Sequence, residues 1–299
     1  MSPAQTTSRG SLGDRRRVIL VIGASSGIGR ATAHRLASRG NRLVLAARSP
    51  TALETAAEEC RQRGAEVLVV PTDVSDEAAV QTLVHAALER FGSLDGCVHA
   101  AAVVAYGRFE EVPAEIFDQV VRTGVLGTAN VARAVLQVFR SQRHGTLVIM
   151  GSLLGKISTP YMSSYVASKA AVESLGRVLT IEQRDLEDVH VCVVSPGSVA
   201  TPVFRQAANY VGRYGRPPPP VVSPEHVAAK VVERLDRPRS RTNVGLANPI
   251  MIFGFRCLPG IFDLLVGPLM RVAGLSRTRV DAHPGNVLTP TPSGDSVRR

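Results

Sequence analysis

Short apolar runs rich in β-branched residues recur along the chain, and longer amphipathic stretches separate them. The runs predict strands at 17–22, 42–47, 66–71, 96–99, 145–150, 189–195 and 242–247. The stretches predict helices at 28–39, 51–63, 76–91, 114–142 and 164–186, and Ser223-Pro224-Glu225 marks the start of another. The strand runs are apolar throughout rather than alternating, which is typical of strands covered on both faces. The pattern therefore predicts an α/β, Rossmann-type, doubly wound and mostly parallel seven-stranded sheet with helices on both faces.

This alternation covers residues 15–247, which we interpret as one domain. Residues 1–14 lack periodicity and are expected to form a disordered arm, and a disordered tail is expected at 277–299. The loop at 197–222 is long and Pro-rich, which favours a functional lid. An apolar extension follows at 248–276, interrupted by Arg, Pro and Asp, so no run approaches the roughly 20 residues of a membrane span.

The extension has two interpretations. We favour packing over the substrate pocket or against a neighbouring subunit. The alternative is weak contact of 248–275 with a membrane surface, with its arginines near the headgroups.

Composition narrows the classes of function. The net charge of +10 comes from arginines that concentrate near the two ends, which favours solvated termini over a nucleic-acid partner. Aromatic residues are only 4% of the chain and Trp is absent, so a surface of stacked aromatics is not expected. The four cysteines are far apart and no apolar leader is visible, so we expect a cytoplasmic protein with free thiols. The scattered His residues predict no metal site.

A glycine-rich turn joins the first strand to the first helix. It reads Gly23-Ala24-Ser25-Ser26-Gly27-Ile28-Gly29. Such a turn lets backbone N–H groups and a helix N-terminus approach a phosphate, so a nucleotide site is expected here, the alternative being a tight turn without a ligand.

With this turn, the sequence resembles the short-chain dehydrogenase/reductase family, and the resemblance covers roughly residues 17–247. The family's turn usually begins with Thr-Gly, and here Ile22 replaces that Thr. An acidic residue at the end of the second strand would repel a ribose 2′-phosphate, whereas this chain has Ala47 and Arg48. Arg48 is therefore expected to bind that phosphate, and in the family this substitution accompanies NADP(H). A solvated surface arginine is the alternative.

Further cofactor contacts are implied by the resemblance. Asp73 and Val74 match the family pair beside the adenine, although Asp73 could instead cap the following helix. Ala101 lies where the backbone approaches the cofactor. After the sixth strand, the family's Pro-Gly turn is matched by Pro196, Gly197, Val199 and Thr201, with a plain turn as the alternative.

The strongest motif is Tyr165-Val166-Ala167-Ser168-Lys169. Residues four apart share one helix face, so the phenol and the ammonium lie together, and a nearby cation favours the phenolate needed for proton transfer. Ser152 precedes Tyr165 at the family's offset, and its hydroxyl can hold a substrate oxygen. The resemblance implies that Ser152, Tyr165 and Lys169 are catalytic and that Lys169 also holds the nicotinamide ribose.

Two departures from the family pattern matter. Gly124 stands where the family has a catalytic Asn, and His99-Ala100-Ala101-Ala102 replaces Asn-Asn-Ala-Gly. We expect NADPH-dependent reduction of a carbonyl, or oxidation of a secondary alcohol, by a homo-oligomer acting on a small lipophilic substrate. The alternative is a non-catalytic NADP(H)-binding or sensor protein on the same fold.

Overall fold

The computed structural model describes residues 16–290. Seven strands form a parallel sheet in the order β12-β7-β6-β4-β1-β2-β3. They are β1 (Val18–Ile22), β2 (Arg42–Ala47), β3 (Glu66–Pro71), β4 (Gly96–His99), β6 (Gly145–Met150), β7 (Val189–Pro196) and β12 (Arg241–Val244). The predicted doubly wound α/β sheet is confirmed, with element bounds close to those expected.

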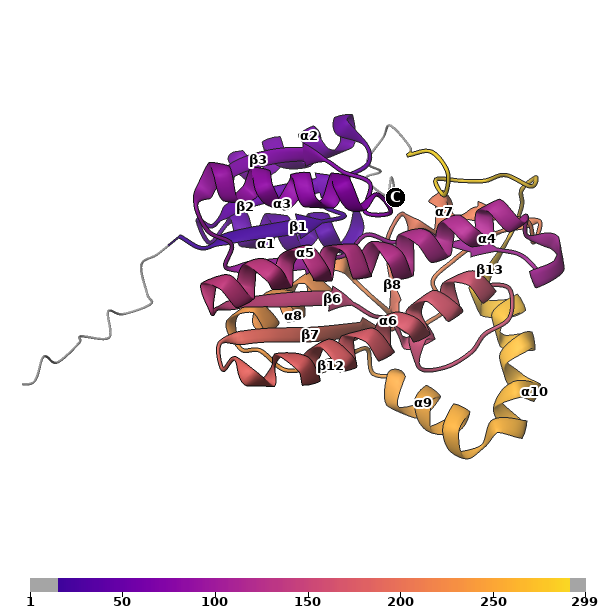
Figure 1. Ribbon diagram of the computed structural model, residues 1–299. Coiled ribbons are helices and arrows are strands. Elements are labelled where there is room, and N and C mark those ends of the chain that lie inside the picture. Colours follow the sequence, from indigo (N-terminus) through magenta and orange to yellow (C-terminus); the bar gives the residue numbers. More distant parts are fainter. Residues whose placement is uncertain (1–15, 291–299) are drawn as a thin grey trace, which may run out of the picture.

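Helices cover both faces of this sheet (Figure 1). One layer contains α1 (Gly27–Ala37), α2 (Pro50–Arg61) and α8 (Pro224–Asp236). The other contains α3 (Glu77–Phe91), α4 (Ala114–Val121), α5 (Gly127–Gln142) and α6 (Ser163–Glu182). This sandwich explains the unbroken apolar strands, because each strand residue meets a helix on one side or the other.

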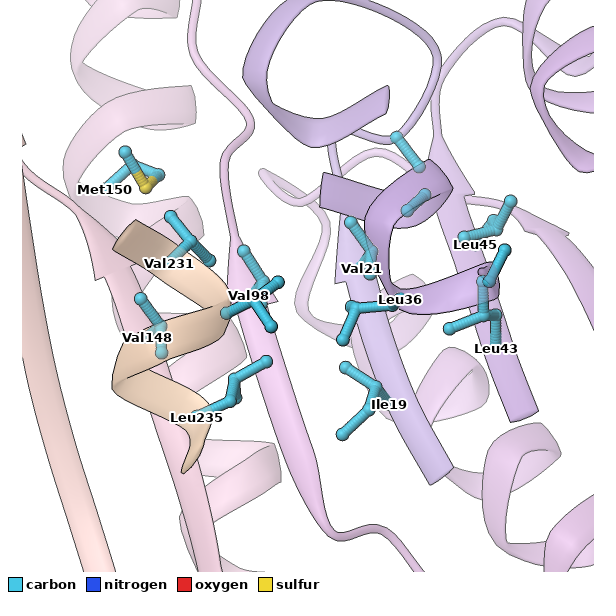
Figure 2. Close-up of a cluster of buried hydrophobic side chains, with 14 of the residues drawn as sticks. Ile19, Val21, Leu36, Leu43, Leu45, Val98, Val148, Met150, Val231 and Leu235 are labelled. Atoms are coloured by element: carbon cyan, nitrogen blue, oxygen red, sulfur yellow. The ribbon is translucent and has the colours of Figure 1, made fainter. Parts of the chain in front are cut away.

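The core between the sheet and the α1/α8 layer is drawn in Figure 2. Leu36 of α1 lies against Ile19 and Val21 of β1, and Leu235 of α8 lies beside Val148 of β6. All are essentially inaccessible to water. Burial of such side chains contributes about 25 cal/mol per Å² of apolar surface and fixes the register of the sheet.

The chain changes direction beside β1. From β1 it proceeds to β2 and β3 on one side, and then crosses to β4 on the other. In open parallel sheets, the crevice at the carboxyl ends of strands flanking such a switch point is where ligands bind. This topology places the glycine-rich turn after β1 next to the segment that follows β4.

The predicted helix at 114–142 is interrupted. A π-helical turn, η2 (Arg122–Leu126), separates α4 from α5. A Cβ on Gly124 would lie only 2.9 Å from Cβ of Ser168, so the close approach of α6 requires glycine here. Such turns inside α-helices are frequent at functional sites.

The long segment after β7 contains short elements. They are β8 (Ser198–Val199), α7 (Val203–Gln206), β9 (Ala208–Asn209), β10 (Arg213–Gly215) and β11 (Val221–Val222). β11 pairs with β8, and β9 pairs with β5 (Ala105–Tyr106). The segment is therefore fastened to the body through backbone pairing.

The expectation of a structureless tail from residue 277 needs correction up to residue 290. β13 (Leu275–Arg279) pairs antiparallel with β10, and His283 forms a bridge with Asn209. Val287 is completely buried in a cluster with Val103 and Ala208. Two apolar residues, Val287 and Leu288, between Pro, Gly, Asn and Thr are too few to give a periodic signal, which is why the sequence did not reveal this anchor. The expected arm at 1–14 and the residues from 291 onward lie outside the described residues.

The apolar extension forms two helices, α9 (Asn248–Cys257) and α10 (Pro259–Leu269). Figure 1 shows them as a hairpin that projects from one end of the body. Within residues 16–290, no helix is both long enough and apolar enough to cross a membrane.

Candidate active site

The glycine-rich turn leaves its backbone accessible at the end of β1. Gly23 has φ +82°, and a Cβ there would lie 2.7 Å from the backbone nitrogen of Ala101. Ser26 is the N-cap residue of α1, but its hydroxyl makes no capping hydrogen bond. The first N–H groups of α1 and this hydroxyl remain available to a phosphate, and the turn therefore fits a nucleotide diphosphate.

One cavity extends from this turn to the first two turns of α6. Every residue predicted at the site lines it: Gly23, Ser25, Ser26, Gly27, Ile28, Gly29, Arg48, Asp73, Val74, Ala101, Ser152, Tyr165, Lys169, Pro196, Gly197, Val199 and Thr201. The structure thus brings the glycine turn and the Tyr-Lys pair, which are far apart in the sequence, into one crevice.

Arg48 follows β2 at one end of the cavity. Its guanidinium donates hydrogen bonds to the carbonyl oxygens of Asn286, and of Val287 at 3.0 Å. Burial lowers the pKa of Arg48, and the nearby negative charge of Asp73 opposes that shift. A guanidinium has five N–H donors, so the two bonds to the tail leave others for an anion.

Asp73 is not the helix cap that we considered as an alternative. Its carboxylate accepts hydrogen bonds from the backbone nitrogen of Ser75 at 2.9 Å and from the Ser75 hydroxyl at 2.7 Å. Asp76 caps α3 instead, through the backbone nitrogens of Ala78 and Ala79. Asp73 is therefore fixed at the cavity wall by Ser75.

The opposite end of the cavity holds Tyr165, Ser152 and Lys169. Burial raises the pKa of Tyr165 to about 12, and a hydrogen bond with Ser152 opposes this shift. Burial lowers the pKa of Lys169 to about 8, against the attraction of Glu173. The Lys169 Nζ donates to the Met150 carbonyl at 2.7 Å and lies 5.7 Å from the centroid of the Tyr165 ring. The phenol of Tyr165 can therefore donate a proton, and the nearby Lys169 cation favours its deprotonated form.

A partly buried polar network adjoins these residues, and the sequence analysis did not predict it. Lys156 Nζ lies 3.6 Å from the Glu173 carboxylate and donates to Ser195 Oγ at 3.0 Å. The Ser195 hydroxyl in turn donates to Glu173. Glu173 follows Lys169 by one helical turn, and that spacing was the signal available in the sequence. The network holds a carboxylate close enough to Lys169 to act on its charge.

His99 at the end of β4 is part of a second buried network. Its Nε2 lies 3.1 Å from Thr128 Oγ1, and that hydroxyl donates to the Gly124 carbonyl at 2.6 Å. Burial and the positive charge of Lys169 lower the pKa of His99 to about 3, so the ring is neutral at physiological pH. Both positions at which the chain departs from the family pattern are thus joined by one chain of hydrogen bonds.

The structure also adds residues that the sequence did not indicate. Gln206 of α7 and Asn286 line the cavity, and the Asn286 amide donates to the Gln206 side chain at 3.2 Å. Thr123 of η2 lines it as well. Within residues 16–290, no group of three or more His, Cys, Asp or Glu side chains could hold a metal ion.

Comparison with known proteins agrees with this geometry. The family model of short chain dehydrogenase matches residues 17–210. An uncharacterised oxidoreductase of Bacillus subtilis (strain 168), YxnA, is 29% identical over 258 residues, which cover 85% of this chain and 72% of that protein.

Solved structures are similar over most of the chain. A short-chain dehydrogenase/reductase from Burkholderia phymatum in complex with NAD has a TM-score of 0.73 and 28% identity, and the match covers 84% of this chain and 96% of that one. An alcohol dehydrogenase from the archaeon Thermococcus sibiricus, complexed with 5-hydroxy-NADP, has a TM-score of 0.67 and 30% identity, covering 76% and 94%. The chain belongs to the short-chain dehydrogenase/reductase family and is an NAD(P)-dependent oxidoreductase of that family.

Proposed function

We propose that the protein is an NADP(H)-dependent enzyme that reduces a carbonyl group or oxidises a secondary alcohol. The observation that carries this proposal is the shared cavity, which has Arg48 at one end and Ser152, Tyr165 and Lys169 at the other. Arg48 supports the choice of NADP(H), because a guanidinium beside the end of β2 favours a 2′-phosphate. The residues present fit the cofactor: the N-terminus of α1, which lines the cavity, would hold the diphosphate, and Lys169 would hold the nicotinamide ribose.

A bound nicotinamide would supply or accept the hydride. Tyr165 donates a proton to the carbonyl oxygen during reduction, and a pKa of about 12 keeps the phenol protonated and ready at neutral pH. Ser152 holds the same oxygen through its hydroxyl. The Lys169 ammonium stabilises the phenolate that remains, and the same cation favours proton removal when an alcohol is oxidised.

The surroundings of Tyr165 support a lipophilic substrate. Tyr165 packs into a cluster with Leu154, Val203 and Phe204, and α7 carries the last two residues over the cavity. An apolar wall beside a single proton donor selects a carbonyl on an otherwise apolar molecule, because polar substituents there would lose their hydration.

The second candidate is a non-catalytic NADP(H)-binding protein on the same fold. Gly124 favours it, because glycine cannot supply the side chain that the family Asn provides. The intact Ser152, Tyr165 and Lys169 favour the enzyme.

The test is turnover of NADPH with a panel of lipophilic ketones, comparing the full chain with Tyr165→Phe. Removal of the phenol proton should lower turnover by about 10²- to 10⁴-fold while NADPH still binds. Tyr214→Phe is the matched control, since Tyr214 contacts His283 outside the cavity lining and should leave turnover unchanged. Equal turnover in Tyr165→Phe would refute the role of Tyr165, and NADPH binding without turnover of any ketone would favour the non-catalytic protein.

A further inference from the structure

The hairpin of α9 and α10 exposes more large apolar side chains than any other part of the described chain. Five of them are between 56% and 74% exposed, namely Ile250, Phe253, Ile261, Leu264 and Leu265, and Val272 in the π-helical turn η5 (Met270–Gly274) that follows α10 is 74% exposed. Singly exposed apolar residues are ordinary, but several on one projecting hairpin indicate a surface that contacts a lipid phase or another molecule. Figure 1 shows the hairpin standing away from the sheet, and the exposure of these side chains means that no other element among residues 16–290 covers them.

The orientation of α10 is fixed by its other face. Phe262, Val266 and Met270 are spaced by one helical turn and face inward, and Val266 and Met270 belong to the cluster that contains Tyr165. The rings of Phe262 and Phe255 meet edge to face with centroids 5.2 Å apart, which joins the two helices. At the root of α9, the Asn248 amide donates to the carbonyls of Ser195 and Val244. The exposed apolar face is therefore held outward by packing on the opposite side.

The charges around the hairpin are predominantly positive. Residues 246–279 carry four arginines, Arg256, Arg271, Arg277 and Arg279, against one carboxylate, Asp263. All four arginines are exposed, and none takes part in the ion pairs found among residues 16–290. Arg271 instead donates a hydrogen bond to the Tyr161 hydroxyl at 2.8 Å, and Tyr161 packs against the same apolar cluster as Tyr165. An apolar face bordered by unpaired arginines is complementary to an apolar layer bordered by anions.

We propose that the α9–α10 hairpin docks this protein on a lipid bilayer that carries anionic headgroups. The exposed apolar side chains enter the boundary between headgroups and acyl chains, and the arginines contact lipid phosphates and carboxylates. α10 has 11 residues, which is too short to span the hydrocarbon layer, so the hairpin lies in the interface. A second copy fits less well, because a two-fold interface through this face would bring the arginines of both copies together with only Asp263 to offset them.

The experiment is co-sedimentation of the full chain with two kinds of vesicle, pure phosphatidylcholine and phosphatidylcholine containing phosphatidylserine. The full chain should partition preferentially onto the phosphatidylserine vesicles. Ile250→Glu/Leu264→Glu/Val272→Glu should lower that partitioning by at least about tenfold, because three apolar side chains no longer enter the interface. Arg256→Gln/Arg277→Gln/Arg279→Gln should remove most of the preference for phosphatidylserine.

The matched control is Phe109→Glu/Val178→Glu/Ile181→Glu, which adds the same charge at exposed apolar positions outside the hairpin. It should sediment like the full chain. Equal loss in both triple variants, or no binding of the full chain to either vesicle, would overturn the proposal. Light scattering supplies the other decisive outcome: a dimer that the hairpin variant alone converts to monomer, without vesicle binding, would show that a second copy covers this face. None of these readouts depends on turnover.

Discussion

The imidazole of His99 and the hydroxyl of Thr128 lie 3.1 Å apart inside the sheet–helix core. The Thr128 hydroxyl donates its proton to the Gly124 carbonyl, so it accepts from His99, which places the imidazole proton on Nε2. Thr128 thereby connects the end of β4 to the π-helical turn at Gly124. These hydrogen bonds link residues 99 and 124, two of the positions where the family has asparagine and this chain does not.

This link predicts an acid-dependent loss of stability. The pKa of His99 is lowered to about 3, so the unfolded chain binds a proton at this residue between that pH and about 6.5 while the folded protein does not. The free energy of unfolding should therefore fall as the pH drops through this window, by up to about 1.4 kcal/mol per pH unit from this group. His99→Asn should show a correspondingly shallower decline in urea unfolding. If the free energy of unfolding falls with pH equally steeply in both proteins, His99 is not neutral and buried as described.

The contact between η2 and α6 predicts that the family's asparagine cannot simply be restored. A side chain at residue 124 would begin 2.9 Å from Cβ of Ser168, so Gly124→Asn should cost about 1–3 kcal/mol of stability through overpacking. The comparison is Gly260→Asn in α10, because nothing lies within 4 Å of a Cβ at that position. Thermal unfolding measures both variants. If Gly124→Asn unfolds at the same temperature as the parent protein, the packing of α6 on η2 is not as described.

The lowered pKa of Lys169 predicts the alkaline limit of activity. The free protein loses the Lys169 proton with a pKa of about 8, and the neutral amine no longer stabilises a phenolate and is a weaker hydrogen-bond donor to the nicotinamide ribose. The value of kcat/KM for NADPH should fall above about pH 8, since this parameter reports the ionisation of the free enzyme. A profile that stays level to pH 10, roughly the ordinary value for lysine, would show that burial does not act on Lys169 in this way.

Much of the fold was predictable because its signals are local. Runs such as Val18 to Ile22 are apolar on every residue, and the helices between them carry caps such as Asp76 and Ser223. The Tyr165–Lys169 spacing places two side chains on one helix face regardless of the rest of the chain. Most of the other residues that line the cavity were predicted from the resemblance to the family, and they meet because parallel strands place their carboxyl ends at the same edge of the sheet.

The remaining features depend on contacts between distant segments. Arg48 meets the carbonyls of Asn286 and Val287 because one buried valine holds the tail against the body. The π-helical turn contains Gly124, which lies close to Ser168 of α6, and neither residue breaks a helical pattern by itself. The sequence could not show which apolar residues of the hairpin face outward, because a helix that packs against the body and one that exposes its apolar side chains can have the same composition.

The central claim is that this crevice binds NADP(H), and nucleotide titration tests it most directly. NADPH and NADH are titrated against the full chain, Arg48→Ala, and Arg63→Ala as a control outside the cavity, with nucleotide fluorescence as the readout. We predict tighter binding of NADPH than of NADH, a loss of about 10- to 100-fold for NADPH alone in Arg48→Ala, and no change in Arg63→Ala. Equal or tighter binding of NADH would contradict the role of Arg48, and a chain that binds neither nucleotide would contradict the account of the site.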